Sequence, residues 1–234
     1  MAKTIIQWLG HSFFRITSPG GRVILIDPWA EGNPSAAVGV EEIDRADLVL
    51  VTHDHFDHLG QAADLIKKTG ALAVANVETA QRMQNELGVD PEKVIFGGFG
   101  MNIGGSADVN GITVTMTQAF HSSASGAPAG YIIKMEDGTT MYHAGDTGIF
   151  STMSVLGDLY PIDVAMLPIG SVFTMDPVQA ACALTLLRPK NVIPMHFGTF
   201  PILEQNADTF RSEAARRAPD TKIVELKPGE KAEF

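Results

Sequence analysis

Three histidines and an aspartate that could hold a metal ion stand close together in the run Thr-His-Asp-His-Phe-Asp-His at residues 52–58. The run follows an apolar stretch that predicts a buried strand. On extended backbone His53 and His55 point to the same side, and Asp57 with His58 in the next turn can serve a second position. Imidazole and carboxylate donors suit zinc, iron or manganese. The alternative, a polar loop that caps the following helix, gains little from three clustered rings.

Three further donors follow predicted strands elsewhere in the chain, and they are His121, Asp146 and His196. A single histidine beside an apolar strand is usually structural, but several donors at strand ends favour a shared site. Asp146 is predicted to bridge two metal ions. The two predicted ligand sets are His53, His55 and His121 for one ion, and Asp57, His58 and His196 for the other.

Four more polar residues are candidates for supporting roles. His11 ends the first predicted strand, and a functional and a buried structural role are equally open for it. His143 stands three residues before Asp146 and could orient it or contact substrate, although a structural role is simpler. Asp27 is expected to accept a hydrogen bond from a ligand histidine, with turn capping as the alternative. Asp54 lies between two predicted ligands and should face away from them.

The elements that must position these donors fall into two similar halves of a single domain, at about residues 1–96 and 111–234. In the first half, strands are predicted at 5–9, 12–17, 22–27, 47–51 and 71–75, and helices at 59–69 and 78–87. In the second half, strands are predicted at 112–118, 130–135, 139–143, 163–168 and 191–195, and a helix at 177–187. We therefore expect two sheets packed face to face with helices outside. The glycine-rich residues 96–111 lack the spacing of a phosphate-binding loop and are predicted to connect the halves.

Composition narrows the function classes. A chain of 234 residues with 45% hydrophobic composition can bury a full core. Its net charge of −10 repels a phosphate backbone, so nucleic acid is a disfavoured but open partner. The single cysteine, Cys182, cannot form an internal disulfide. Because no stretch approaches the roughly 20 apolar residues that span a bilayer, and no signal core is visible, we expect a cytoplasmic protein without a membrane partner.

The donor pattern resembles that of the metallo-β-lactamase-fold hydrolases, and the resemblance spans nearly the whole chain. It rests on residues 52–60, His121, residues 145–147 and residues 195–199. One branch, of small bacterial and archaeal metal-dependent hydrolases similar also to L-ascorbate-6-phosphate lactonase, is further resembled at residues 8–12, 27–29, 142–148 and 173–175. The resemblance implies an α/β (α+β) fold, a four-layer αββα sandwich of two mixed β-sheets with two divalent metal ions at one edge. In this branch a Gly-His pair stands at the position of His11, which places that ring near the metals.

The resemblance leaves the substrate open, because members cleave lactones, phosphodiesters, thioesters and amides with the same metal core. We predict a binuclear hydrolase in which a metal-bound hydroxide attacks a small ester, lactone or phosphodiester. Zinc is the favoured metal, with manganese or iron as alternatives. Asp57 would orient the hydroxide, and His11 and His143 complete the set of catalytic candidates. A small-molecule substrate is the expected partner, and a homo-oligomer is open.

Three other functions are open at this point. A nuclease is the first, although the chain has no room for the extra nucleic-acid-binding domain that such members often carry. A diiron redox enzyme is the second, but that branch has a glutamate where His55 stands. A binding scaffold is the third, and it would be expected to lack ligands, none of which is missing.

Two segments are predicted to shape the pocket. Residues 122–130, rich in Ser, Ala and Gly, predict a mobile rim directly after His121. Phe173 and residues 197–200 predict apolar surface near the metals. No basic cluster accompanies the donors, which disfavours a strongly anionic substrate.

Overall fold

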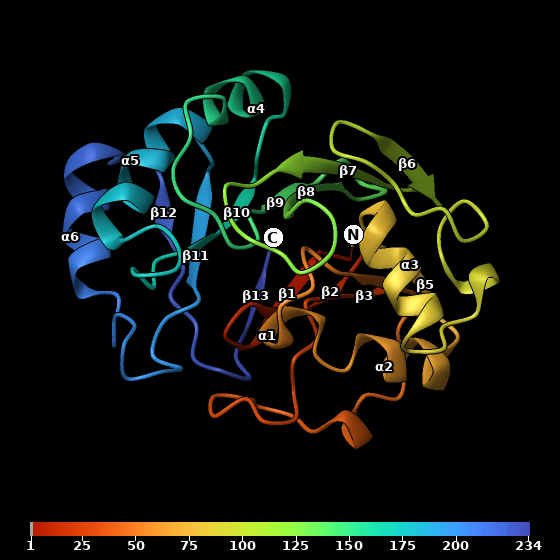
Figure 1. The fold of residues 1–234 in the computed structure, drawn as a ribbon. Coiled ribbons are helices and arrows are strands. Elements are labelled where there is room, and N and C mark those ends of the chain that lie inside the picture. The colour runs from red at the N-terminus through yellow and green to blue at the C-terminus, as the bar shows by residue number, and fades with distance from the viewer. Residues whose placement is uncertain (1) are drawn as a thin grey trace.

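The computed structural model describes residues 2–234 and consists of two β-sheets flanked by helices (Figure 1). The first sheet contains β1 (Ile5–Gly10), β2 (Phe13–Thr17), β3 (Val23–Ile26), β4 (Leu48–Leu50), β5 (Leu72–Val74) and β13 (Lys231–Glu233). The second sheet contains β6 (Ser106–Val109), β7 (Ile112–Gln118), β8 (Ala129–Lys134), β9 (Thr140–His143), β10 (Val164–Pro168), β11 (Asn191–Met195) and β12 (Lys222–Ile223). The α-helices are α1 (Phe56–Leu59), α2 (Ala62–Thr69), α3 (Val77–Asn85), α4 (Met153–Leu159), α5 (Pro177–Leu187) and α6 (Asp208–Arg217). Two short 3-10 helices, η1 (Val40–Glu42) and η2 (Pro91–Lys93), lie in connections.

Both sheets are mixed. The first has the order β13-β1-β2-β3-β4-β5, in which β3, β4 and β5 are parallel and the other neighbours are antiparallel. The second has the order β12-β11-β10-β9-β8-β7-β6, in which β9 to β12 are parallel and β6 to β9 antiparallel. Parallel neighbours bring their carboxyl ends to one edge, where connecting loops can gather functional side chains.

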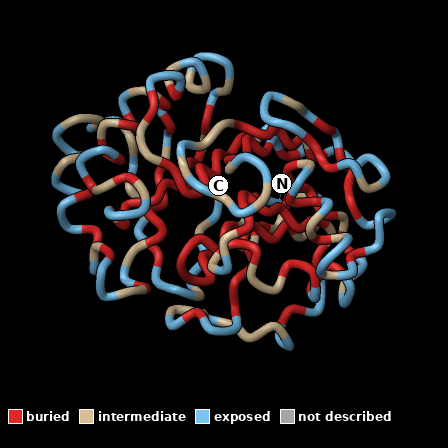
Figure 2. The backbone as a smooth tube through the Cα atoms, viewed as in Figure 1, coloured by how far each residue is buried: buried red, intermediate tan, exposed pale blue. Residues whose placement is uncertain are grey.

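The core has three layers of apolar side chains, as the alternation along the strands requires. Ile24 of the first sheet and Met166 of the second belong to the cluster between the sheets. Leu25, which points the other way, packs under α2 and α3, and Leu167 packs under the helices of the second half. Figure 2 shows the buried residues along both sheets and the exposed ones on the outer helices and loops. The predicted four-layer αββα sandwich is confirmed.

Hydrogen bonds join the two sheets next to the run at residues 52–58. The Tyr131 hydroxyl of β8 donates to the carbonyl of Val51 at 2.7 Å and to that of Val74 at 3.1 Å. The backbone N–H of Ala129 donates to the carbonyl of Thr52 at 3.0 Å. The ends of β4 and β5 are thereby fixed against the second sheet, so donors from both halves can meet.

The helix predicted at residues 59–69 is wrong at its start. The chain forms the short helix α1 from Phe56, breaks at Gly60, and resumes as α2. Gly60 has a φ of +41°, and a Cβ there would lie 2.5 Å from the Cα of Trp29, so this close approach requires glycine. Asp57 and His58 stand on the single helical turn of α1.

Other differences concern weakly patterned segments. Residues 96–111, predicted as a connection, contain β6, which pairs with β7. Helices α4 and α6 and strands β12 and β13 had not been predicted. Because β13 pairs with β1 in the first sheet, the C-terminus crosses back to the first half, and the division into two halves stays a prediction. Within residues 2–234, helices long and apolar enough to cross a bilayer are absent.

Candidate metal centre

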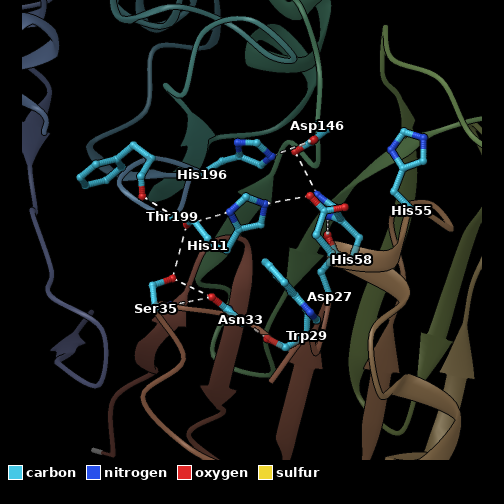
Figure 3. Close-up of polar contacts among 12 residues, drawn as sticks. His11, Asp27, Trp29, Asn33, Ser35, His55, His58, Asp146, His196 and Thr199 are labelled. Atoms are coloured by element: carbon cyan, nitrogen blue, oxygen red, sulfur yellow. Dashed lines mark hydrogen bonds and ion pairs between the residues drawn. The ribbon is translucent and has the colours of Figure 1, made fainter. Parts of the chain in front are cut away.

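All seven predicted ligands, together with His11, gather at one edge of the sandwich, where Figure 3 shows several of them facing one another. Their donor atoms form three overlapping groups in which all atoms lie within 4.8 Å of one another. The groups are His53 with His55 and His121; His11 with Asp57, His58 and His196; and His53 with His58 and Asp146.

The first group lies partly at the protein surface. Nε2 of His53 is 2.9 Å from Nδ1 of His55, and Nε2 of His121 is 3.3 Å from the same Nδ1. His53 and His55 come from the connection between β4 and α1, and His121 follows β7. Donors from both sheets thus converge, as the sequence predicts.

Asp146 lies between the two predicted ligand sets. Its Oδ1 is 3.3 Å from Nε2 of His58, and its Oδ2 is 3.0 Å from Nε2 of His196 and 3.6 Å from Nε2 of His121. A carboxylate that faces donors of both sets through its two oxygens has the arrangement needed for a bridging ligand.

The donors fit divalent metal ions because several of their buried polar atoms lack hydrogen bonds. Among the described residues, Nε2 of His58, Oδ1 of Asp146 and both ring nitrogens of His196 are buried without a hydrogen-bond partner. An unsatisfied buried polar atom costs about 1–3 kcal/mol, and a bound cation would satisfy several of them together. Imidazole and carboxylate are also the donors that zinc and similar cations accept.

Asp27 orients His58 from behind. Nδ1 of His58 donates to Oδ2 of Asp27 at 2.7 Å, which confirms the predicted hydrogen bond between Asp27 and a histidine of the run. The Thr52 hydroxyl donates to the same oxygen at 2.6 Å, and the Thr52 N–H donates to Oδ1 at 2.8 Å. Because Nδ1 is committed to Asp27, Nε2 of His58 is left to face the donor cluster.

The buried donors shift one another's pKa values before any metal binds. Burial alone would lower the pKa of His58, but Asp146 and Asp27 outweigh it and raise that pKa well above its usual value. Burial alone would raise the pKa of Asp146, but His196 and His58 hold it well below its usual range. Burial lowers the pKa of His53 to about 3, so that ring is neutral at physiological pH. A cation that binds here therefore displaces the proton of His58.

Three residues at the centre adopt left-handed backbone conformations that L-residues rarely use. His11, Asp27 and His196 have φ of 55°, 48° and 58°, and they follow β1, β3 and β11 respectively. Each costs roughly 1–2 kcal/mol. A Cβ on Gly170 would lie 2.1 Å from the carbonyl oxygen of His196, so this glycine permits the turn that carries His196. Strain of this kind persists where the surrounding structure enforces it, typically at functional sites.

His11 belongs to the centre, and its ring is fully buried between two partners. Its Nε2 is 3.2 Å from Oδ2 of Asp57, and its Nδ1 is 2.9 Å from the Thr199 hydroxyl. A chain of hydrogen bonds runs from Thr199 through Ser35 to Asn33, as Figure 3 shows. Burial, followed by the charge of His196, lowers the pKa of His11 to about 4. Sequence reasoning missed Thr199, because nothing local to residues 197–200 indicates a partner at the other end of the chain.

His143 lies apart from the donor groups. The ring is fully buried, its Nε2 is hydrogen-bonded to the carbonyl of Ser12 at 3.2 Å, and the N–H of Gly145 donates to its Nδ1 at 3.2 Å. The predicted contact with substrate stays a prediction. The orienting alternative fits better, because His143 fixes the turn that carries Asp146.

Asp54 faces away from the donors, as predicted, and anchors the segment after His121. Its carboxylate accepts hydrogen bonds at 2.6 Å from Nη1 of Arg82, the Ser123 hydroxyl and the Ser125 hydroxyl, and at 2.7 Å from a backbone N–H. These bonds anchor residues 123–125, and the mobility of the rim predicted at residues 122–130 stays a prediction. Burial would raise the pKa of Asp54, but its hydrogen bonds from the serines and Arg82 lower it.

A pocket of about 500 Å³ opens beside the donors. Its walls are formed by His55, Phe56, Asp57, His121, Ser122, Asp146, Phe173, His196 and Phe200. The expected apolar surface at Phe173 and Phe200 is thus confirmed, whereas Phe197 stacks on Trp8 with ring centres 5.4 Å apart and lies outside the pocket lining.

Known proteins are similar to this chain in sequence and in fold. The family described as the beta-lactamase superfamily domain matches residues 22–197. A metal-dependent hydrolase of Nitratidesulfovibrio vulgaris is 56% identical over 97% of this chain and 94% of its own length. A metal-dependent hydrolase of Lawsonia intracellularis is 47% identical over 99% of this chain and 100% of its own. The solved structure of Igni18, a metallo hydrolase from Ignicoccus hospitalis, has a TM-score of 0.89 at 37% identity and covers 100% of this chain and 99% of its own.

Proposed function

Because the chain belongs to the beta-lactamase superfamily and to its metal-dependent hydrolases, we propose that it is a binuclear hydrolase of a small ester, lactone or phosphodiester. The observation that carries the proposal is the position of Asp146. Its carboxylate faces His58 and His196 of one ligand set and, through Oδ2, His121 of the other. A shared carboxylate between two donor groups is the feature that distinguishes a two-ion centre from a single site.

In this proposal His53, His55 and His121 hold one cation, and Asp57, His58 and His196 hold the other, with Asp146 shared. When bound, two divalent cations, with zinc favoured over manganese or iron, would supply a hydroxide nucleophile at neutral pH and a Lewis acid for the substrate oxygen.

The protein's own groups prepare this chemistry. Asp27 fixes the ring of His58 through the 2.7 Å hydrogen bond, so Nε2 is presented without a search over ring orientations. Asp57 lines the pocket and has one oxygen held by His11. Burial would raise the pKa of Asp57, but His11 and His58 lower it, so it is a carboxylate at neutral pH. Its other oxygen can therefore accept a hydrogen bond from the attacking water and orient it.

Metal analysis tests the two-ion proposal. Protein purified without added metal and handled without chelators should contain about two divalent ions per chain, as a two-metal site requires. A content near one ion would contradict the shared role of Asp146, and a content near zero would contradict the centre as a whole.

Substitution tests the hydrolytic role. Asp57→Ala and His58→Ala should each abolish hydrolysis across a panel of esters, lactones and phosphodiesters assayed with zinc, manganese and iron. Circular dichroism should show that both variants keep the fold. Asp163→Asn is the matched control. Asp163 lies just before β10 and away from the pocket, and its carboxylate accepts hydrogen bonds from Lys190 and from the backbone N–H of Thr140. Retained activity in either site variant would remove that residue from the mechanism.

A further inference from the structure

Phenylalanine side chains form a wall of the pocket that metal binding does not explain. Phe56 and Phe173 line the pocket and are 69% and 53% exposed. Phe200 completes the wall beside His196. Exposed aromatic rings gathered around a concave site commonly mark a binding surface for an apolar group.

The turn that carries Phe173 is strained. Ser171 and Val172 have consecutive left-handed φ values of 63° and 48°, and the N–H of Phe173 donates to the carbonyl of Ser171. A β-branched residue such as Val172 is a rare outlier in this region. The strain leaves both Val172 and Phe173 mostly exposed instead of burying them. A conformation that costs free energy twice, in strain and in apolar exposure, is expected where it serves binding.

The rest of the wall is fixed from behind. Trp29 is buried, and its ring centre lies 5.6 Å from that of Phe56 in an edge-on arrangement and 5.8 Å from that of Phe200 in a stacked one. Packing against a buried indole holds both phenyl rings in place. The wall is therefore formed before a ligand arrives.

The pocket offers no positive side chain to an anionic substituent. Apart from the metal-donor side chains, the lining consists of Phe56, Phe173, Phe200 and Ser122, without lysine or arginine among the described residues. The nearby Arg82 is committed to Asp54 at 2.6 Å. The net charge of −10 adds a general repulsion of anions.

Given the hydrolase function proposed above, we propose that the substrate is a small uncharged ester or lactone whose aryl or branched alkyl group lies against Phe56, Phe173 and Phe200. A pocket of about 500 Å³ falls in the range that takes small organic ligands. In the reaction the water oxygen forms a bond to the carbonyl carbon and the carbon–oxygen bond to the leaving group breaks. The leaving oxygen takes up one proton, so an ester gives a carboxylic acid and an alcohol, and a lactone gives a single hydroxy acid.

Two matched ligand pairs test the proposal on the metal-loaded protein. Methyl phenylacetate and monomethyl succinate share a methyl ester and differ in carrying a phenyl ring on one methylene group or a carboxylate on two. Phenylacetone and levulinate are the corresponding ketones, which are not hydrolysed, so calorimetry reports their binding alone. We expect kcat/KM for methyl phenylacetate to exceed that for monomethyl succinate. Phe173→Ala should lower the kcat/KM for methyl phenylacetate relative to that for monomethyl succinate. It should also raise the Kd of phenylacetone by about tenfold, while the Kd of levulinate stays unchanged.

Phe99→Ala is the matched control, because Phe99 is 74% exposed and does not line the pocket. Phe173→Lys should favour the anionic member of each pair, so kcat/KM should rise for monomethyl succinate relative to methyl phenylacetate and Kd should fall for levulinate relative to phenylacetone. The proposal is overturned if monomethyl succinate is the better ester, or if Phe173→Ala leaves the Kd of phenylacetone unchanged. If phenylacetone binds as expected but neither these esters nor the wider panel is hydrolysed, the proposed hydrolysis fails while the apolar recognition stands.

Discussion

The two predicted ligand sets are held in different ways. The side chains of His58 and His196 are 0% and 2% exposed, whereas that of His121 is 11% exposed. Behind His58 stand the Asp27 carboxylate and Thr52. Of the rim donors, His53 is buried with its Nδ1 3.1 Å from the Thr52 hydroxyl, whereas His55 has the longer 3.4 Å contact between the Ser122 hydroxyl and its Nε2.

Preorganisation is concentrated around His58. The group around His58 combines a committed ring orientation with left-handed backbone at His196. Such outer partners typically contribute 10–100-fold to metal affinity. We therefore expect the buried subsite to bind its cation more tightly than the rim subsite, which comprises His53, His55 and His121.

The largest effect is expected from replacement of Asp146, the residue proposed to be shared by both subsites. Asp146→Ala should weaken both subsites and lower kcat/KM by more than about 100-fold, a larger loss than removal of an outer partner. The variant is assayed for metal content by mass spectrometry and for turnover. Asp158→Ala is the control, because this carboxylate is 69% exposed and pairs with Arg188. A variant that retains two ions would show that Asp146 is not shared.

A second substitution acts on the buried subsite alone. Asp27→Asn keeps the size of the side chain but removes the charge that holds Nδ1 of His58 at 2.7 Å. One equivalent of metal should bind about 10–100-fold more weakly and the other should be unchanged, as measured by competition with a chromogenic chelator. Asp163→Asn is again the control. Equal weakening of both equivalents would mean that the two subsites share their support, and Asp27 would then not act on the buried subsite alone.

The sequence predicted the parts of the site that depend on local pattern. The run at residues 52–58 and the donors after β7, β9 and β11 needed only residue type and strand periodicity. The role of His11 stayed open because its partners, Asp57 and Thr199, are 46 and 188 positions away in the chain. Contacts of that range depend on how the two sheets pack, and a single sequence carries no record of it.

The fold shows the same division. Apolar alternation predicted the long central strands, but α6 buries only Phe210 and Ala214, which is too weak a pattern to stand out from a polar segment. The break at Gly60 was missed because helical periodicity continues across it. Its cause is the close approach of Trp29, which only the folded chain creates.

A third substitution acts on the rim subsite. Asp54→Asn should loosen residues 123–125 by weakening their hydrogen bonds, and hydrogen exchange there should become faster. Asp54 supports the rim donors only through this segment, so we expect weakening of the rim cation by less than about tenfold. Glu86→Gln is the matched control, because Glu86 contacts Arg82 at 3.1 Å from the solvent side without touching the segment. Equal loss at the buried subsite would contradict a role confined to the rim.

The smallest expected effect tests the support of Asp57 on the buried side. Thr199→Val keeps the shape of the side chain but removes the hydroxyl 2.9 Å from Nδ1 of His11. Because the pKa of His11 is lowered to about 4, this is a bond between neutral groups, which contributes about 1 kcal/mol and corresponds to roughly fivefold in rate. His11 does not line the pocket, so the loss should fall on kcat and leave KM unchanged, and Thr199→Ser should restore it. A loss in KM instead would place Thr199 in substrate binding, and an unchanged kcat would show that Asp57 needs no second support.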